Sequence, residues 1–308
     1  MKKQIIVFGV AITALVLPAA VVITEAGDNF LQPDQIMQIH GLWAVVLLMF
    51  QFILTSRVRF LDRWIGLDRL IHAHRFIGIA AIAAALVHTL MYSIPAALQD
   101  YLIPELPDDW AIAAGMLSLT LLLLLGITAA AYRKLHLKYD TWRRIHQTAY
   151  IILPLVLLHA YFGGTHLSYH PLLQGQMLMM TAVVAGLLLQ RLFRTIRIRR
   201  NPQAVTEVYR PTHDTTSVRF TRPEGFSAQP GQFAILRFHG RELKEAPHPY
   251  TLSDISNPEY LEITAKAIGD FSSEIPRLQK RDTIYVDGPH GIFTPVPTEK
   301  SVLWIAGG

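Results

Sequence analysis

Four histidines lie in two apolar stretches of the chain, two in each stretch. The first stretch, residues 71–92, contains His74 and His88, and the second contains His146 and His159. On an α-helix the separation of His74 and His88 corresponds to about 21 Å along the axis and to a difference in direction of roughly 40°, so both share one face. An imidazole in hydrocarbon is costly unless it has a partner. Two haems, each held by one histidine from each stretch, fit four such side chains at two matching depths.

In the second stretch, the spacing of the two histidines does not place them on one face of a straight helix. Thirteen residues separate His146 from His159, which leaves their directions about 140° apart on a straight helix. Pro154 lies between them, removes a backbone donor and can kink and rotate a helix. A kink at this proline is the feature that can bring both histidines to one side.

A histidine inside a membrane has other roles than holding a metal. Any single one can be a hydrogen-bonded packing residue or a proton relay, and two depth-matched pairs favour haem over both. His72 competes with His74 for the inner position, but its direction matches less well. His40, near the outer side of the second span, is interpreted as packing in preference to lining an acceptor site. His166 and His170 are expected in an outer loop, solvated in preference to binding a metal substrate.

Apolar residues concentrate in the first two thirds of this chain of 308 residues, which is 51% hydrophobic. This distribution is typical of a membrane domain joined to a soluble domain. The absence of cysteine excludes disulfides, zinc–thiolate sites and cysteine-held iron–sulfur clusters. Six stretches are long enough to cross a bilayer, and they cover residues 4–23, 36–55, 72–94, 111–131, 146–161 and 172–192.

Basic residues divide the connections between these spans into two groups. Sixteen Lys and Arg residues lie in 2–3, 56–71, 132–146 and 191–200, whereas 24–35, 95–110 and 161–171 contain none. By the positive-inside rule, both termini are cytoplasmic and the chain lies in a plasma (inner) membrane. The net charge of +5 therefore reflects topology and attraction to membrane lipid, and no nucleic-acid partner is expected. The first apolar run is longer than a signal core, so we expect a retained span.

After residue 200 the pattern changes to short alternating segments. Strands are expected over residues 204–209, 216–221, 233–238, 261–266 and 283–287, with turn residues such as Pro230-Gly231 and Asp287-Gly288-Pro289 between them. Several short strands at this spacing indicate a small antiparallel barrel. The predicted fold is an α-helical membrane bundle of six transmembrane helices over residues 1–200, followed by a small antiparallel β-barrel over residues 201–298.

Two stretches of the predicted barrel suit a flavin. In 248–253 an aromatic ring followed by a hydroxyl can pack on the isoalloxazine and meet its polar edge, although these are also ordinary strand residues. In 266–273 a strand ends, glycine permits close backbone approach and serine can cap a helix whose N-terminus binds a diphosphate. A simple capped helix is the alternative there. The candidate flavin-binding residues are His248, Pro249, Tyr250, Thr251, Lys266, Gly269, Phe271, Ser272 and Ser273.

Together these motifs resemble the ferric reductase and NADPH oxidase superfamily. In the membrane half the matching residues are His74-Arg75, Gly78, His88, His146 and His159. The soluble half resembles the ferredoxin-reductase type flavin domain in residues 229–233, 248–253, 269–272 and 287–289. The resemblance implies that the four histidines hold two b-type haems and that the barrel binds FAD. No side chain is assigned a catalytic role.

The resemblance further implies an oxidoreductase that carries electrons from NAD(P)H through FAD and two haems to an acceptor outside. A ferric chelate or oxygen is the implied acceptor, and ferric iron is favoured because Tyr92 stands where oxygen-reducing members have a further histidine. The chain departs from the family at 299–308, where a nucleotide-binding domain is expected only to begin. A separate nucleotide-binding domain or reductase is then a possible partner. Alternative classes are a haem-binding cytochrome subunit served by such a reductase, and a transporter with histidine proton relays.

Overall fold

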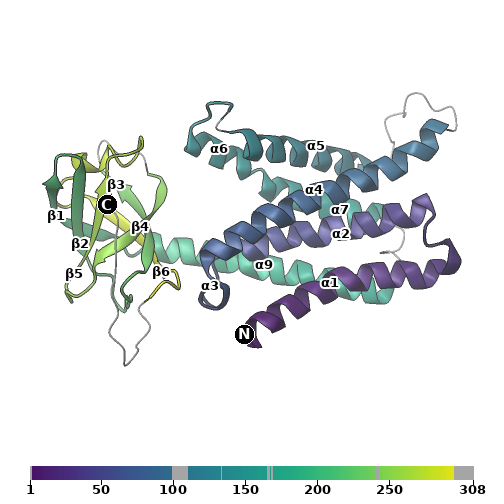
Figure 1. Cartoon of the computed structure of the whole chain (residues 1–308), viewed down its shortest axis with the longest axis horizontal. Helices are drawn as coiled ribbons and strands as arrows, with labels where there is room; N and C mark the ends of the chain where they lie inside the picture. Colours follow the sequence, from purple (N-terminus) through teal and green to yellow (C-terminus); the bar gives the residue numbers. More distant parts are fainter. Residues whose placement is uncertain are drawn as a thin grey trace. The chain divides into compact units, whose positions relative to one another are not determined.

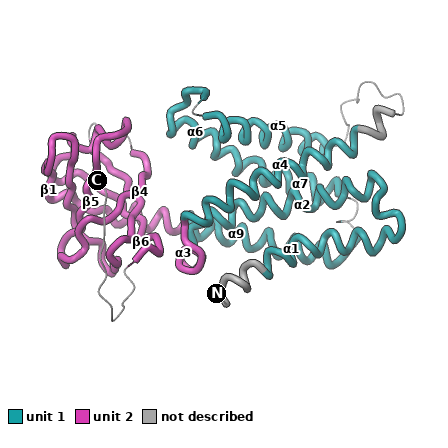
Figure 2. Tube along the Cα trace, in the orientation of Figure 1, with its two compact units in different colours: residues 1–58, 68–191 teal, residues 59–67, 192–308 magenta. Residues whose placement is uncertain are grey.

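The structure is a computed structural model that describes residues 2–98, 110–132, 134–164, 167, 169–240, 243 and 245–294 (Figure 1). The chain divides into two compact units, which Figure 2 colours separately. The first unit comprises residues 1–58 and 68–191, and the second comprises residues 59–67 and 192–308. The second unit thus includes a short segment from between the second and third spans. The expected start of a nucleotide-binding domain at 299–308 lies outside the described residues, as does His166.

Long apolar helices form the first unit. Six helices in the described part of the chain are long and apolar enough to cross a membrane, at Gly9–Asn29, Pro33–Leu54, Leu67–Ser93, Trp110–Ala131, Tyr139–Gly163 and Pro171–Arg199. The chain is therefore an integral membrane protein. The α-helices are α1 (Lys2–Ala26), α2 (Pro33–Leu54), α3 (Arg59–Ile65), α4 (Leu67–Leu98), α5 (Trp110–Ala131), α6 (Tyr139–His146), α7 (Ala149–Gly163) and α9 (Pro171–Arg199).

Apolar side chains point both into this bundle and out of it. Val46, Met49 and Met177 are fully buried among the helices. Phe76 and Leu124, by contrast, leave 67% and 55% of their surface exposed. Helices satisfy their backbone hydrogen bonds internally, so lipid hydrocarbon can cover such an exposed apolar surface without cost.

Proline in α1 leaves one carbonyl in need of a donor, and α9 supplies it. Pro18 has no N–H with which to bond the carbonyl of Ala14 four residues earlier. The side chain of Gln176 donates to that carbonyl at 2.7 Å. The indole N–H of Trp43 donates to the next carbonyl, that of Leu15, at 2.8 Å. An apolar environment requires such partners, so these bonds fix α1 against α2 and α9.

The second unit contains a closed antiparallel barrel with the strand order β1-β2-β5-β4-β3-β6. Its core consists of apolar side chains such as Phe220, Phe238 and Ile263. Pairing of β1 with β6 closes the barrel, which removes free strand edges. The six-helix and barrel fold class predicted from the sequence is confirmed. The strands are β1 (Gln203–Thr212), β2 (Thr215–Thr221), β3 (Phe233–His239), β4 (Pro247–Asp254), β5 (Tyr260–Lys266) and β6 (Thr283–His290).

Strand β4 was absent from the sequence prediction because two prolines stand in it. Pro247 and Pro249 pair only with β3, opposite Arg237 and Ile235. Pairing of β4 with β5 begins later, at Leu252. Proline has no N–H to donate, so it is tolerated in a strand where one side needs no partner. The motif at 248–253 is thus a strand and brings its side chains to a defined place in the barrel.

Two other local expectations are corrected by the barrel. Asp287-Gly288-Pro289 does not end a strand, because β6 continues to His290 through an irregularity opposite β3. Gly288 permits this, since a Cβ there would lie 3.1 Å from the Cβ of Ala234. The helix expected after Ser273 is also wrong. Residues 270–274 form turns, and only a short 3₁₀ helix, Ile275–Arg277, follows, with Pro276 inside it.

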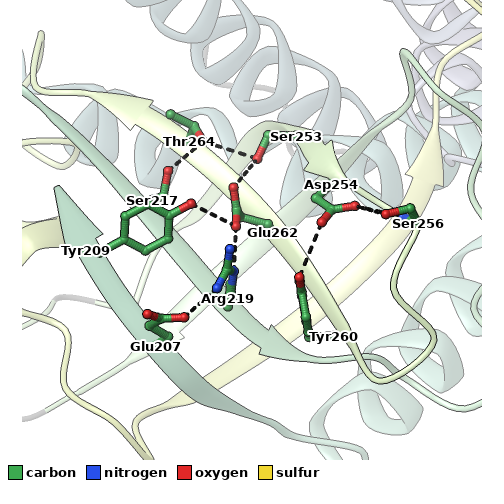
Figure 3. A network of polar contacts seen from close by, with 10 residues as sticks. All are labelled: Glu207, Tyr209, Ser217, Arg219, Ser253, Asp254, Ser256, Tyr260, Glu262 and Thr264. Atoms are coloured by element: carbon green, nitrogen blue, oxygen red, sulfur yellow. Dashed lines mark hydrogen bonds and ion pairs between the residues drawn. The ribbon is translucent and has the colours of Figure 1, made fainter. Parts of the chain in front are cut away.

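A polar network on β1, β2, β4 and β5 is satisfied by its own members (Figure 3). Arg219 donates to Glu262 at 2.7 Å and to Glu207 at 2.6 Å. Its guanidinium also lies over the rings of Tyr209 and Tyr260, 5.1 Å from each centroid. These bonds raise the pKa of Arg219. Because the charges are paired within the network, we interpret it as structural support for the barrel wall.

Candidate functional site

The four predicted histidines meet as two pairs within the membrane bundle. His74 of α4 and His146 of α6 have ring centroids 5.9 Å apart, with an angle of 66° between the rings. His88 of α4 and His159 of α7 have centroids 6.0 Å apart at 70°. Helix α4 therefore supplies one histidine to each pair, and the two pairs are separated by about 21 Å of helix rise.

A break between α6 and α7 allows both pairings despite the 13-residue spacing. Helix α6 ends at His146, and α7 begins at Ala149. At the break, the N–H of Gln147 bonds the carbonyls of Arg143 and Arg144, and the N–H of Thr148 bonds the carbonyl of Ile145 at 3.0 Å. Hydrogen bonds from an N–H to the carbonyl three residues earlier, as in a 3₁₀ helix, tighten the turn and change the direction of the side chains. The interruption thus lies at residues 147–148 rather than at Pro154.

The ring nitrogens of the second pair are oriented by neighbouring helices. Nδ1 of His88 lies 2.8 Å from the carbonyl oxygen of Met37 on α2. Nδ1 of His159 lies 2.9 Å from the carbonyl oxygen of Ala111 on α5. Since a carbonyl only accepts, Nδ1–H must donate, and the lone pair of Nε2 stays available to a metal.

Two glycines make room for these imidazoles. A Cβ on Gly41 of α2 would lie 2.7 Å from Nδ1 of His88, and a Cβ on Gly115 of α5 would lie 2.7 Å from Nδ1 of His159. Separations this short force the ring to move. Each glycine therefore lets a helix pass close enough for its carbonyl to reach the ring. The sequence analysis missed both residues, because an isolated glycine in an apolar helix has no distinctive pattern.

The first pair has different surroundings. The side chain of Gln51 makes three contacts here. Its amide nitrogen donates to the carbonyl of His74 at 2.9 Å and lies 2.6 Å from Nδ1 of His74. Its amide oxygen accepts from the N–H of Gly78 at 3.0 Å. The ring of Trp142 packs against His146, with centroids 5.3 Å apart. Nδ1 of His146 is buried without a hydrogen-bond partner in the described part of the chain. Gln51 and Trp142 are thus the side chains that position this pair.

The spacing of both pairs fits one metal ion between two imidazoles. Imidazole nitrogens bind metals at about 2.0–2.1 Å, so two rings on opposite sides of one ion have centroids roughly 6 Å apart. The observed separations are 5.9 and 6.0 Å. Two imidazoles are a donor set that suits haem iron, and no group of three or more His, Cys, Asp or Glu side chains that could hold a metal occurs among the described residues. The residues present therefore fit haem at both levels.

The other membrane histidines do not enter these pairs. The side chain of His72 is exposed. Nδ1 of His40 lies 2.8 Å from the carbonyl oxygen of Ile36, and its ring meets Trp43 edge-on at 5.3 Å. Nε2 of His170 lies 3.5 Å from a carboxylate oxygen of Glu25. Their contacts are those of packing or surface residues.

In the barrel, the structure brings together the two stretches expected to bind flavin. The rings of His248 on β4 and Phe271 in the turn after β5 are stacked, with centroids 3.9 Å apart and 24° between their planes. Phe271 also lies 5.9 Å from Phe238, which contacts Tyr250 edge-on at 5.8 Å. Burial raises the pKa of Tyr250 to about 12, so its hydroxyl remains a hydrogen-bond donor at neutral pH.

The turn after β5 presents free backbone donors. The hydroxyl of Ser272 accepts from the N–H groups of Ile268 and Gly269, at 3.1 and 3.0 Å. No acceptor among the residues described bonds the N–H groups of Asp270, Phe271 or Ser272. Consecutive unpaired N–H groups in a turn form a concavity that can bind an anion such as a diphosphate.

Of the remaining candidate flavin-binding residues, two bond within the protein and two are exposed. Lys266 pairs with Asp214, at 3.4 Å, on the strand end beside the turn. Ser273 donates its hydroxyl to the carbonyl of Gly269 at 2.9 Å. The side chains of Pro249 and Thr251 are exposed on β4. Lys266 and Ser273 are thus engaged within the protein, whereas Thr251 remains accessible.

Two family models match successive parts of the chain. Residues 40–157 match the model described as "Ferric reductase like transmembrane component", and residues 200–293 match the model described as "FAD-binding domain". The two matches together describe a ferric reductase-like transmembrane component followed by an FAD-binding domain. Over these two regions the chain is similar to ferric reductase and NADPH oxidase-like proteins.

Individual relatives are distant. Dual oxidase 2 of Rattus norvegicus is 23% identical over 291 residues, which cover 82% of this chain and 19% of that protein. The haem-binding subunit MsrQ of the protein-methionine-sulfoxide reductase of Caulobacter vibrioides is 28% identical over 139 residues, 44% of this chain and 63% of the subunit. The chain therefore spans about a fifth of the length of that dual oxidase.

Among solved structures, part of the chain is similar to a ferredoxin NADP+ reductase from Neisseria gonorrhoeae with bound FAD and NADP. The identity is 25%, and the similarity covers 28% of this chain and 35% of the reductase. The TM-score is 0.25.

Proposed function

We propose that the chain transfers electrons across a membrane, from reduced FAD at the barrel through two b-type haems to an acceptor on the other side. The observation that carries the proposal is the pair of histidine pairs, His74 with His146 and His88 with His159, each at the spacing of two axial ligands. When bound, the haems and FAD would supply the redox chemistry.

The protein's own residues have defined parts in this function. Two imidazoles on each iron would leave no open coordination position, which suits electron transfer rather than oxygen binding. The carbonyls of Met37 and Ala111 hold the second pair in the tautomer that a metal needs. Tyr250, Phe271 and the free N–H groups of the turn would hold the flavin ring and diphosphate.

The names of similar proteins support this proposal. A haem-binding subunit matches part of the chain, and dual oxidases match most of it. We infer a ferric chelate or oxygen as the acceptor, and NAD(P)H as the original electron donor. We also infer cytoplasmic termini in a plasma or inner membrane, since the Lys- and Arg-rich connections alternate with connections that have none.

A second candidate is a haem-binding subunit that receives electrons from a separate reductase or nucleotide-binding domain. The match to a protein named as such a subunit favours it. In that case the haems are reduced only when a reductase is added, whereas our first proposal requires that FAD bound to this chain reduces them.

An absorption spectrum of the purified chain tests the proposal. We expect low-spin haem bands that shift when dithionite is added, with two haems and one flavin per chain after reconstitution. Photoreduction of the bound flavin should then reduce the haems without another protein. A chain that binds no haem contradicts both candidates. Haem reduction that needs an added reductase supports only the second.

The flavin site can be tested separately. Replacing Tyr250 and Ser272 together with alanine should weaken FAD binding at least about tenfold, because stacking area and the support of the turn are both lost. Flavin fluorescence titrations measure this. The matched control is Tyr285→Ala with Ser227→Ala, which removes the same groups elsewhere in the second unit. Equal FAD affinity in the double variant and the unaltered chain would place the flavin elsewhere.

A further inference from the structure

A buried polar cluster in the second unit joins three segments that are distant in sequence. Asp62 lies on α3, Arg194 lies near the end of α9, and Asp287 and His290 lie on β6. His290 is 2% exposed and Asp62 is 5% exposed. All three segments belong to the same compact unit, as the shared colour in Figure 2 shows. Asp287 belongs to the stretch 287–289 that resembles the flavin domain, but none of these residues was given a role, and the proposed electron path does not use them.

His290 is the centre of the cluster. Its Nδ1 lies 3.1 Å from a carboxylate oxygen of Asp62. Its Nε2 lies 3.6 Å from a carboxylate oxygen of Asp287, which also pairs with Arg194. The guanidinium of Arg194 lies 3.4 Å from Nε2. Phe233 on β3 covers the ring, with centroids 5.7 Å apart. Both ring nitrogens therefore face carboxylates, as in an imidazolium that donates from each.

The charges balance when His290 is protonated. Asp62 and Asp287 then carry two negative charges, and Arg194 and His290 carry two positive charges. A neutral His290 takes one positive charge away from the buried carboxylate of Asp62, where the loss of a charge partner is costly. In that state Nε2 can only accept, and Arg194 is the donor within reach at 3.4 Å.

The pKa values of the pair agree with this account. Burial alone would lower the pKa of His290, but hydrogen bonds to Asp287 and Asp62 outweigh it and raise the pKa above the ordinary 6.5. Burial alone would raise the pKa of Asp62, but His290 and the backbone amides of Gly291 and Leu67 lower it below 3.8.

We propose that His290 is a positioning residue whose imidazolium clamps α3 and the end of α9 to the flavin barrel, and thereby sets the rate of electron transfer from flavin to haem. The statement about rate rests on the proposed function. The clamp itself rests only on the contacts within the second unit.

The place of the clamped segments in the chain explains why the clamp matters. Helix α3 ends at Ile65, and α4 begins at Leu67 with His74 seven residues further on. Helix α9 ends at Arg199, and β1 begins at Gln203. The barrel is thus connected to the membrane helices covalently through α9 and non-covalently through α3. Releasing α3 leaves a single connection, which allows more motion between donor and acceptor.

The dependence of the clamp on pH follows from the directions of the two pKa shifts. The contribution of His290 is fully present below its ordinary pKa and is lost as the pH rises through the raised pKa. The contribution of Asp62 is present above its ordinary pKa and is lost as the pH falls through the lowered pKa. The clamp is therefore closed at pH values between the ordinary pKa of Asp62 and that of His290, and it opens as the pH rises through the raised pKa of His290.

Distances between two spin labels test the clamp directly. The chain contains no cysteine, so Arg63→Cys on α3 and Lys280→Cys on the barrel provide two unique attachment sites on exposed residues. In the full chain in detergent, we expect one narrow distance below the ordinary pKa of histidine and a broad distribution once the pH exceeds the raised pKa of His290. A narrow distance that does not change with pH overturns the clamp.

Two variants separate the role of His290 from a simple loss of folding. His290→Gln should broaden the distribution at all pH values and raise the detached fraction at least about tenfold, because a buried charge loses its partner. Asp62→Asn, on the other side of the contact, should do the same without altering the barrel. The control is His213→Gln, an exposed histidine between β1 and β2, which should behave as the unaltered chain. Unchanged distances in both test variants contradict the proposal.

The effect on electron transfer is measured in the same samples. We expect flavin photoreduced in the full chain to reduce the haem at least about tenfold more slowly in His290→Gln, with unchanged haem and flavin content. In the unaltered chain the rate should fall with the fraction of clamped molecules as the pH rises. An equal rate in the variant overturns the link to transfer. Absence of haem or flavin instead overturns the proposed function, while the label distances still decide the clamp.

Discussion

Replacing His88 with alanine should lower the haem content of the purified chain from two haems to one, and replacing His74 as well should lower it to none. Under the proposed function each imidazole would be one of two ligands of the same haem, so its loss would leave that haem held by a single histidine. His146→Ala should remove the same haem as His74→Ala, and His159→Ala the same haem as His88→Ala. Pyridine haemochrome spectra quantify the loss.

The matched control for these variants is His72→Ala. It alters a histidine on the same helix, two residues from His74, whose side chain is exposed and lies outside the pairs. We expect it to keep both haems. The sharpest test combines His88→Ala with His146→Ala, which removes one ligand from each pair. Two haems in that double variant would mean that the paired histidines are not the ligands.

Adding a single methyl group at Gly41 or Gly115 should displace the haem held by His88 and His159 while leaving the other in place. A Cβ at either position would lie 2.7 Å from a ring nitrogen, so the imidazole must turn or the helix must retreat. Either movement breaks the bond from Nδ1–H to the carbonyl of Met37 or Ala111 that aims the ring. We expect about half of the haem absorbance to be lost in the double variant Gly41→Ala with Gly115→Ala.

The control for the glycine variants is Gly186→Ala on α9, where a Cβ would meet nothing within 4 Å. Alanine favours a helix over glycine by about 1 kcal/mol, so a loss of haem cannot be attributed to weaker helices. Circular dichroism should show unchanged helix content in all three variants. Full haem content with an unaltered spectrum in the double variant would contradict the close fit between glycine and histidine.

The sequence predicted the elements of this protein better than the details that aim its side chains. Hydropathy and spacing were sufficient for six spans and for the pairing of His74 with His146 and of His88 with His159. The break at Gln147–Thr148 could not be predicted, because neither residue is a glycine or a proline and the turn is held by ordinary backbone bonds. Sequence spacing also cannot predict long-range contacts such as that between Asp62 and His290, which are 228 residues apart.

In the barrel, too, the sequence pattern predicted most strands but not the features that depend on neighbouring strands. Alternating residues predicted five strands, whereas β4 was hidden by prolines that are tolerated only because its first half has one neighbour. The turn after β5 was expected to begin a helix because Ser272 and Ser273 are good caps. Their hydroxyls instead hold the loop itself, at Ile268 and Gly269. The same side chains thus stabilise a turn rather than begin a helix.

The break between α6 and α7 has a consequence for how the membrane half tolerates changes in length. On α4, inserting one residue between His74 and His88 would turn one of them by about 100° relative to the other, and one pair would be lost. Between His146 and His159 the chain already changes direction at residues 147–148. An inserted residue there lengthens a turn and need not rotate either helix. Homologous chains of varying length should therefore keep the spacing on α4 and vary it between α6 and α7.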